Sequence, residues 1–444
     1  MYLKKSKNNK TGRTYLYIAD GYHDREKGYT KTITVQSLGY LDVLEKQYDD
    51  PIAHFTEVVK QMNEEKKQQN LSVPMQVSLN DKLEINTNNL YNFGYAALSK
   101  IYHELEIDKF LISKFKSRDV SEFKINNIIK LLTFSRCLFP DSKKSTYDNR
   151  NIFFENTNFS LKEVYNTLTY IEPFKESLQS YIYDHIQEQY KPKNECVFYD
   201  VTNYYFEIDD NDDFRKKGVS KEHRPNPIVQ MGLFMDSLGL PMCYGLFPGN
   251  TNDCLTLKPM VQKLQTNYNI GKVIVVADKG LNTGEIIEAK SQLSLDEEKI
   301  AEEEKLDGYY AIVSSEFNKT DDEIIDIYRG LWRIEETFKV TKSELEDRPI
   351  YVSTKEHIEA HFLTCYLALV LCRVLQHKLN KKYSVEKILE SLKQCNCSHI
   401  ENNYYLFNYF DDILKDIGDA VSIDFSNKYM RLQEIKKNLA ETKK

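Results

Sequence analysis

The sequence predicts a multidomain α/β protein built around a mixed sheet, in the order β-β-β-α-β followed by a helix. Two short runs, residues 196–200 and 272–278, are continuously apolar or β-branched and each ends in an aspartate, Asp200 and Asp278. Such runs are typical of strands buried on both faces. A carboxylate is costly to bury unpaired, so two of them at strand ends suggest one shared site at a sheet edge. A third carboxylate, Glu335, follows on a later helix.

Composition is that of an ordinary globular protein: 444 residues, 41% hydrophobic and 29% charged, enough for two to four domains. The net charge of −7 lacks the basic footprint usual for nucleic-acid binding, but residues 4–13 and 215–224 are locally basic. The eight cysteines lie mostly in apolar runs, and no secretory segment follows Met1, so we expect a reduced, cytoplasmic setting.

The first 80 residues predict a small α+β module that ends in a polar linker. Residues 14–18 and 31–37 alternate as paired strands do, with Asp20-Gly21 and Gly28 as turn chemistry between them. Asp50-Pro51 then predicts a helix start, with aspartate as N-cap and proline at the first helical position.

Residues 81–194 predict a bundle of four or five helices, which could bind DNA ends or only support the next domain. Apolar residues recur on single faces at helical spacing: Ile125, Ile128, Ile129 and Leu132 in one helix, and Val164, Leu168 and Ile171 in another. Further on, the apolar run 361–375 is too short for a bilayer and carries Arg373, so we expect a core helix and no membrane segment.

The predicted catalytic domain spans residues 195–395. Its strands are expected at 196–207, 228–235 and 241–247, with a turn at 236–239 that makes the last two a hairpin. The remaining elements are a helix capped by Thr251 or Asn252, the strand that ends at Asp278, a short strand at 309–313, and a helix begun by the capping box Thr320–Glu323. Residues 396–444 are expected to be a C-terminal helical tail. This order, with its two aspartates, is the plan of the ribonuclease-H-like fold, an inference by fold analogy.

The helix that follows Thr320 is expected to complete the site. Spacings of seven residues nearly complete two turns, so Tyr328, Glu335 and Lys342 are predicted to share one face. Glu336, about 100° away, is the competing and less favoured candidate. The alternative is that Glu335 and Lys342 are exposed charges that only border an apolar face of the helix. Trp332, the single tryptophan, is expected in the core, with base stacking as the less favoured alternative.

Three carboxylates suit two Mg²⁺ ions, for which Mn²⁺ can substitute. One ion would activate a water on a phosphodiester and the other would stabilise the departing 3′-oxygen, which could then attack a second strand. Lys342 could hold a phosphate near these ions.

With these motifs the sequence resembles bacterial insertion-sequence transposases of the DDE type, in the group whose third motif reads Y-x2-R-x3-E-x6-K. The matching stretch runs from Tyr328 through Glu335 to Lys342, and 199–202 and 277–280 match the first two motifs. The resemblance implies catalysis by Asp200, Asp278 and Glu335. It also implies a ribonuclease-H-like core that cuts and joins double-stranded DNA at the element ends and the target. The protein would form a homodimer in the DNA complex. It would act in the bacterial cytoplasm, at the nucleoid. Contacts to the DNA backbone would come from Tyr328, Lys342, Arg215, Lys216, Lys217, Lys221, His223 and Arg224.

Two departures keep other functions open. The arginine position of the third motif is Leu331, and Glu335 follows Asp278 by only 57 positions (335 − 278), which leaves at most a reduced insertion near 285–308. A DNA-binding remnant without turnover, or a structure-selective nuclease, remains an alternative. A phosphatase is the least favoured because no glycine-rich phosphate loop accompanies the site.

Overall fold

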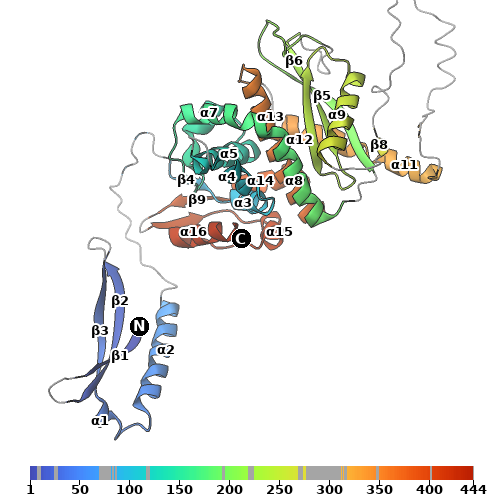
Figure 1. Ribbon diagram of the computed structural model, residues 1–444. Helices are drawn as coiled ribbons and strands as arrows, with labels where there is room; N and C mark the ends of the chain where they lie inside the picture. Colours follow the sequence, from blue (N-terminus) through green and yellow to red (C-terminus); the bar gives the residue numbers. More distant parts are fainter. Residues whose placement is uncertain are drawn as a thin grey trace, which may run out of the picture. The chain divides into compact units, whose positions relative to one another are not determined.

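The chain folds as two compact units, Met1–Asn86 and Thr87–Lys444 (Figure 1). The computed structural model describes residues 1–7, 12–24, 29–69, 82, 85, 88–116, 121–192, 196–218, 225–268, 274–276, 312, 314, 318–346, 350–400 and 403–443. The predicted strand at 309–313 therefore lies outside the described residues, apart from Ile312.

The first unit is an antiparallel sheet in the order β1-β2-β3 with a long helix. Its elements are β1 (Tyr2–Lys7), β2 (Thr14–Asp24), β3 (Tyr29–Tyr40), α1 (Leu41–Leu44) and α2 (Pro51–Gln69). The predicted pairing of these two strands, β2 and β3, is confirmed. Asp20 and Gly21 lie inside β2, opposite Ile33 and Thr32, so a turn at these two residues is wrong, and Gly28 lies outside the described residues. The cap of α2 is confirmed, because Asp50 Oδ1 accepts from the amides of Ile52 and Ala53 at 3.0 Å.

The second unit opens with helices that pack around one long central helix. These are α3 (Tyr95–Glu104), α4 (Ile107–Phe115), α5 (Glu122–Leu138), α6 (Lys143–Asp148), α7 (Leu161–Ile171) and α8 (Lys175–Tyr190). The described part thus holds six helices rather than four or five, because the short α6 is a separate element after the break at Pro140. The predicted apolar faces of α5 and α7 are confirmed, and all seven of their residues are buried.

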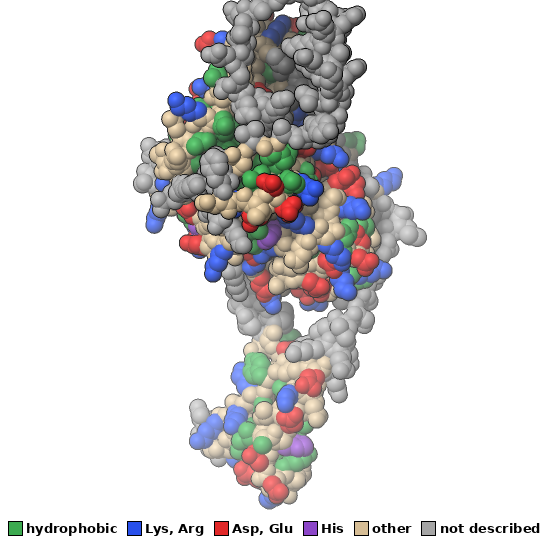
Figure 2. Space-filling view, turned by 90° about the vertical axis from the view of Figure 1, so that its right-hand side faces the viewer, with side chains coloured by type: hydrophobic (Ala, Val, Ile, Leu, Met, Phe, Trp, Pro, Cys, Tyr) green, Lys and Arg blue, Asp and Glu red, His purple; other side chains and the backbone are tan. Residues whose placement is uncertain are grey.

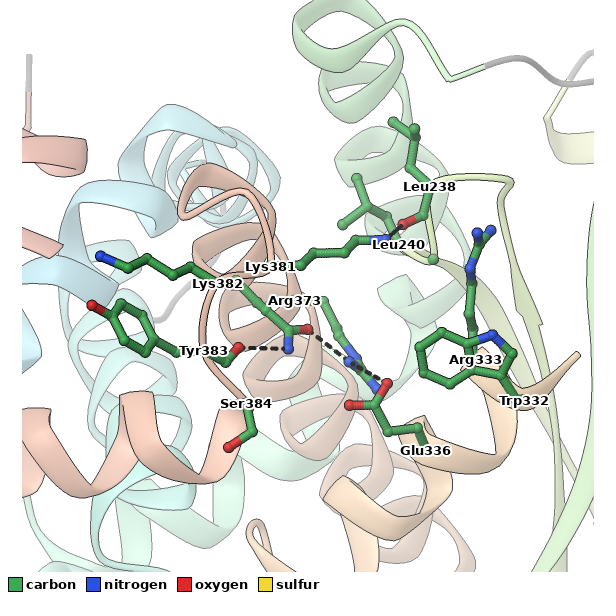
Figure 3. A pocket seen from close by; sticks show the side chains of 12 residues that line it. Leu238, Leu240, Trp332, Arg333, Glu336, Arg373, Lys381, Lys382, Tyr383 and Ser384 are labelled. Atoms are coloured by element: carbon green, nitrogen blue, oxygen red, sulfur yellow. Dashed lines mark hydrogen bonds and ion pairs between the residues drawn. The ribbon is translucent and has the colours of Figure 1, made fainter. Parts of the chain in front are cut away.

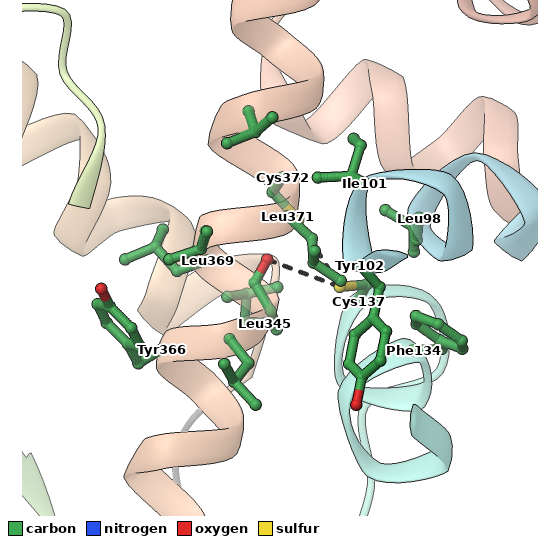
Figure 4. Close-up of a cluster of buried hydrophobic side chains, with 14 of the residues drawn as sticks. Leu98, Ile101, Tyr102, Phe134, Cys137, Leu345, Tyr366, Leu369, Leu371 and Cys372 are labelled. Carbon is green, nitrogen blue, oxygen red and sulfur yellow. Dashed lines mark hydrogen bonds between the residues drawn. The ribbon is translucent and has the colours of Figure 1, made fainter. Parts of the chain in front are cut away.

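The central helix is α13 (Lys355–Lys378), and it is the core of the second unit. Figure 4 shows its side chains against α3 and α5, where Cys137 Sγ lies 3.8 Å from the Ala368 carbonyl. Among the described helices, only α13 is long and apolar enough to cross a bilayer, and its whole apolar window is buried inside the protein. The predicted core helix is confirmed.

The predicted β-β-β-α-β order is also confirmed. The elements are β5 (Cys196–Tyr205), β6 (Ile228–Met235), β7 (Pro241–Pro248), α9 (Asp253–Asn267) and β8 (Ile274–Val276). The sheet order is β7-β6-β5-β8, with β5 antiparallel to β6 and parallel to β8. Of the two proposed caps of α9, Asn252 is the one used, since its side chain accepts from the Cys254 amide at 3.1 Å.

Helices cover the two faces of this sheet differently (Figure 1). On one face Tyr199 donates to Thr256 Oγ1 of α9 at 2.7 Å. On the other, Tyr204 packs edge-to-face on Phe362 of α13, with ring centroids 5.0 Å apart. The helices α11 (Asp321–Arg329) and α12 (Trp332–Ser343) follow in sequence, and α12 packs on β5. The capping box at Thr320 is confirmed.

The end of the chain is not only helical. After α14 (Val385–Gln394) come β9 (Asn396–His399), β10 (Tyr404–Phe407), α15 (Asp412–Val421), β11 (Tyr429–Arg431) and α16 (Leu432–Glu441). With β4 (Leu90–Asn92) the three strands form an antiparallel sheet, β11-β10-β9-β4. The helical tail expected from residue 396 is thus corrected: the strands have only three or four residues each, too few to show a period in the sequence.

Candidate active site

Asp200 lies in the middle of β5, on the face that carries α12 and α13. Successive side chains of a strand point to opposite faces. Phe198 and Tyr204 contact α12 and α13, whereas Tyr199 contacts α9, so Asp200 shares the face of Phe198 and Tyr204. Its carboxylate is half-buried, and Oδ1 accepts from the Val201 amide at 2.7 Å.

Two contacts fix α12 along β5. At its start, a side chain added at Gly330 would come within 2.5 Å of Phe198 Cζ, so the turn before the helix packs directly on the ring of this strand residue. Near its end, the Tyr204 hydroxyl hydrogen-bonds with Thr341 Oγ1 at 2.8 Å. Strand and helix therefore run in the same direction.

These anchors bring Asp200 and Glu335 to the same level. Asp200 is two residues beyond Phe198, about 7 Å at 3.3 Å per strand residue. Glu335 is five residues beyond Gly330, about 7.5 Å at 1.5 Å per helix residue. The Glu335 side chain is exposed, on the flank of the buried stripe Leu331, Ile334, Phe338 and Thr341.

Glu336 is held elsewhere. Its carboxylate lies 3.5 Å from Arg373 Nη1 of α13, a guanidinium that is only 6% exposed. The preference for Glu335 over Glu336 as the third carboxylate thus has a physical basis, because Glu336 already balances a buried charge.

The expected single helix is two helices. Gly330 and Leu331 form a turn between α11 and α12, and the amides of 330, 331, 333 and 334 bond three residues back rather than four. Tyr328 therefore belongs to α11, and the face it was predicted to share with Glu335 and Lys342 does not continue across the turn. Glu335 and Lys342 are still two turns apart within α12, and Lys342 Nζ lies 5.8 Å from the centroid of the Tyr204 ring.

Leu331, at the arginine position of the third motif, is 7% exposed and part of the core. The adjacent arginines have other partners: Arg329 pairs with Asp326 at 3.3 Å, and Arg333 donates to the Ser237 carbonyl at 2.7 Å. Arg329 lies on α11 before the turn and Arg333 is held on the β6–β7 turn, so neither occupies the position of the motif's arginine.

Trp332 is 56% exposed, so its predicted core position is wrong. It precedes the buried Ile334 by two residues, which is about 200° around the helix and almost opposite to the buried stripe. This angle could have been obtained from the sequence once Ile334 and Phe338 had been recognised as the buried face.

Asp278 lies outside the described residues. The last described residue of β8, Val276, pairs with Phe198 in parallel register. Asp200 and Asp278 each follow this pair by two positions in the sequence.

The basic loop is described only in part. Arg215 Nε pairs with Asp212 at 2.6 Å, the backbone of Lys216 bridges to Ile228, and Lys217 is exposed. Lys221, His223 and Arg224 lie outside the described residues. On the face drawn in Figure 2, Lys and Arg side chains alternate with Asp and Glu rather than forming one basic surface.

The donor set fits a hard divalent cation, because Asp200 and Glu335 offer only carboxylate oxygens. Across the described part of the chain, no three His, Cys, Asp or Glu side chains converge on a metal-sized site. The third member of the predicted set, Asp278, is not among those residues.

Two segments match known protein families. Residues 205–371 match the transposase DDE domain, a range that contains Glu335 and begins five positions after Asp200 (205 − 200). Residues 3–74 match the N-terminal domain of IS1634 family transposases. No curated protein matches the chain.

The mixed sheet, its helices and the DDE match define a phosphoryl-transfer enzyme of the DDE class, a class that generally uses divalent metal ions. With the N-terminal match, the chain is an IS1634 family transposase with a DDE domain. This family implies a DNA substrate.

Proposed function

We propose that the protein binds the terminal inverted repeats of its mobile element and performs Mg²⁺-dependent DNA cleavage and strand transfer with Asp200, Asp278 and Glu335. The observations that carry the proposal are the two contacts between β5 and α12, from which residue spacing puts Asp200 and Glu335 at the same level. Asp200 and Asp278 each follow the parallel pair Phe198–Val276 by two residues in the sequence, which supports Asp278 as a member of the same site.

Each residue has a stated task in this proposal. Asp200, Asp278 and Glu335 hold the metal ions; bound Mg²⁺, or Mn²⁺ in its place, would supply an activated water and stabilise the leaving 3′-oxygen. Lys342, on the same flank of α12 as Glu335, neutralises a strand phosphate. Tyr328 contacts the backbone from α11. The segment Arg215, Lys216, Lys217, Lys221, His223 and Arg224 holds the flanking duplex.

Recognition of the element ends falls to residues 1–194 in this proposal. Two ends must be held for joining, so we propose a homodimer on DNA, acting at the bacterial nucleoid. The mixed charges of the surface in Figure 2 favour contacts through local basic segments rather than through the net charge.

Cleavage of a labelled duplex that carries the element's own end tests the proposal. We expect nicking with Mg²⁺ or Mn²⁺ by the unaltered protein and none by Asp200→Asn, because the amide is a neutral ligand. The control is Asp326→Asn, at a carboxylate that is 75% exposed on α11. Equal cutting by Asp200→Asn would refute the assignment.

A DNA-binding remnant is the second candidate, and buried Leu331 in place of the motif's arginine favours it. It predicts salt-sensitive binding of the element end without cutting in either metal. A nuclease on the same fold would cut but would not join the 3′-end to a target, so a strand-transfer assay separates it from the transposase.

A further inference from the structure

A second site lies on the other flank of α12. A pocket of about 220 Å³ opens between the β6–β7 turn, α12, α13 and the segment that follows α13 (Figure 3). Glu335 does not line it, whereas its neighbours Trp332, Arg333 and Glu336 do. The pocket and the carboxylate site therefore share a helix but occupy different sides of it.

The lining is strongly cationic. Arg333, Arg373, Lys381 and Lys382 line the pocket, against the single carboxylate of Glu336. Two cations are paired: Arg373 with Glu336 at 3.5 Å, and Lys382 with Asp416 at 2.6 Å.

The other two cations meet backbone carbonyls instead of anions. Arg333 donates to Ser237 O and Lys381 to Leu238 O, each at 2.7 Å, and the described residues supply neither with an ion pair. Gly239 gives this turn its left-handed backbone, at a φ of 80°, and a side chain there would make only ordinary contacts with Arg333 and Lys381, at 3.6 and 3.8 Å. Burial, and then the charges of Arg333 and Arg373, lower the pKa of Lys381, as expected for a cation crowded by cations.

One polar group in the pocket wall is unsatisfied. Arg373 is 5% exposed, and its Nε has no hydrogen-bond partner among the described residues. Its other nitrogens donate to Gln376 and Thr337 at 2.8 and 2.7 Å. A buried guanidinium without a full set of acceptors is costly, so the positive charge of Arg373 favours an anion in the pocket that it lines.

The wall also carries the only tryptophan of the chain. In Figure 3, Trp332 and Arg333 lie across the pocket from Lys382 and Tyr383. The indole is 56% exposed, so the core does not explain it. An exposed aromatic face beside cations is the arrangement on which nucleic-acid bases stack, and each stacked base contributes about 1–3 kcal/mol.

We propose that this pocket binds a nucleotide, with its phosphate at Lys381 and Arg373 and its base against the Trp332 indole. The volume of about 220 Å³ is too small for a drug-sized ligand, and it suits a phosphate with its sugar while the base lies outside on the indole. The nucleotide comes from an unpaired stretch of DNA strand or from the free pool. The preference for the strand rests on the proposed function.

Trp332 reports on the pocket directly, because the chain has no other tryptophan. We would titrate the full protein, without divalent cations, with single-stranded oligothymidylate, its duplex with oligoadenylate, thymidine monophosphate and inorganic phosphate. We expect saturable quenching by the single strand, and a loss of affinity of about tenfold in Lys381→Gln, the value of one charge-assisted hydrogen bond. The matched control, Lys387→Gln, changes an exposed lysine of α14 outside the pocket and should bind as the unaltered protein does.

The arms separate the outcomes. Tighter binding of the strand than of the monophosphate assigns a strand nucleotide, and equal binding assigns a free one. Quenching of Lys381→Gln equal to that of the unaltered protein, together with no quenching of Glu335→Gln, would overturn binding in the pocket. The strand would then bind on the flank of α12 that carries Glu335. Inorganic phosphate competing as well as the nucleotides would overturn the role of the base.

As a second readout, Trp332→Ala should weaken binding of a labelled strand, measured by anisotropy. Because no metal is present, a protein that cannot cut DNA can still pass this test.

Discussion

The two flanks of α12 hold their charged side chains in different ways. On one flank Glu335 is exposed, and no ion pair to it is present among the described residues, although Asp200 stands at its level on β5. On the other flank Glu336 is bound to buried Arg373, and Arg333 is fixed on the β6–β7 turn. Neighbouring glutamates thus have opposite tasks: one is available to a ligand, and the other keeps the helix in place.

The first prediction compares the two glutamates. We expect Glu335→Gln to lower the rate of DNA cleavage by at least about 10³-fold, because it removes a charged ligand from the proposed metal site. Glu336→Gln should keep the rate within about tenfold and instead lower stability, because Arg373 loses its counter-charge. Cleavage rates at saturating Mg²⁺ check this, with circular dichroism to confirm folding. The reverse pattern would make Glu336 the third carboxylate.

A second prediction concerns the turn that fixes Arg333. Asp236 is fully buried, and its Oδ1 accepts from the amides of Leu238 and Leu240 at 2.9 Å. Burial raises the pKa of Asp236 from 3.8 to about 7. The folded state therefore holds the proton more tightly than the unfolded state, so the free energy of unfolding should fall by about 4 kcal/mol as the pH rises from about 4 to above 7.

Asp236→Asn should remove this contribution, since the amide keeps an acceptor oxygen and does not titrate. Urea unfolding followed by Trp332 fluorescence at pH 5 and pH 8 measures it. Relative to the variant, the unaltered protein should lose stability at the higher pH. Parallel pH dependences in both proteins would show that Asp236 does not titrate in this range.

A third prediction concerns the ion pair between Arg373 and Glu336. Arg373→Met leaves Glu336 without its partner and deprives Thr337 and Gln376 of a donor. We expect a loss of about 3 kcal/mol in the free energy of unfolding. The matched control is Arg329→Met, whose ion pair with Asp326 is 75% exposed on both sides and should contribute less than about 1 kcal/mol. Equal losses would mean that burial does not distinguish the ion pair between α12 and α13 from the exposed pair on α11.

Much of this arrangement could be predicted from the sequence because it depends on local patterns. The apolar runs that end in Asp200 and Asp278 gave the strand order, and the capping box gave the start of α11. Glu335 and Glu336 are neighbours on one helix. In the sequence, only the angle of about 100° between them distinguished the two candidates for the third carboxylate.

Other features depend on contacts that no local pattern encodes. The turn at Gly330 and Leu331 interrupts the uniform 100° step on which the shared face of Tyr328 and Glu335 was based. The pocket joins the β6–β7 turn to α12 and to residues 381–384, segments far apart in the sequence. The pairing of β4 with β9 joins strands about 300 residues apart, too short for either to be recognised alone.

The smallest predicted effect concerns the contact that keeps the Glu335 flank aligned with β5. Tyr204→Phe removes the hydroxyl that bonds Thr341 at 2.8 Å and leaves the ring packed on Phe362. We expect a stability loss of about 1 kcal/mol, the net value of one buried hydrogen bond. If this contact also sets the level of Glu335, the cleavage rate should fall more than the stability loss explains, because positioning of catalytic groups within about 1 Å affects rates strongly. Thr341→Val should give the same result, and the double variant should cost no more than either single change. Additive losses would show that the two side chains act separately, and that other contacts of α12 align Glu335 with Asp200.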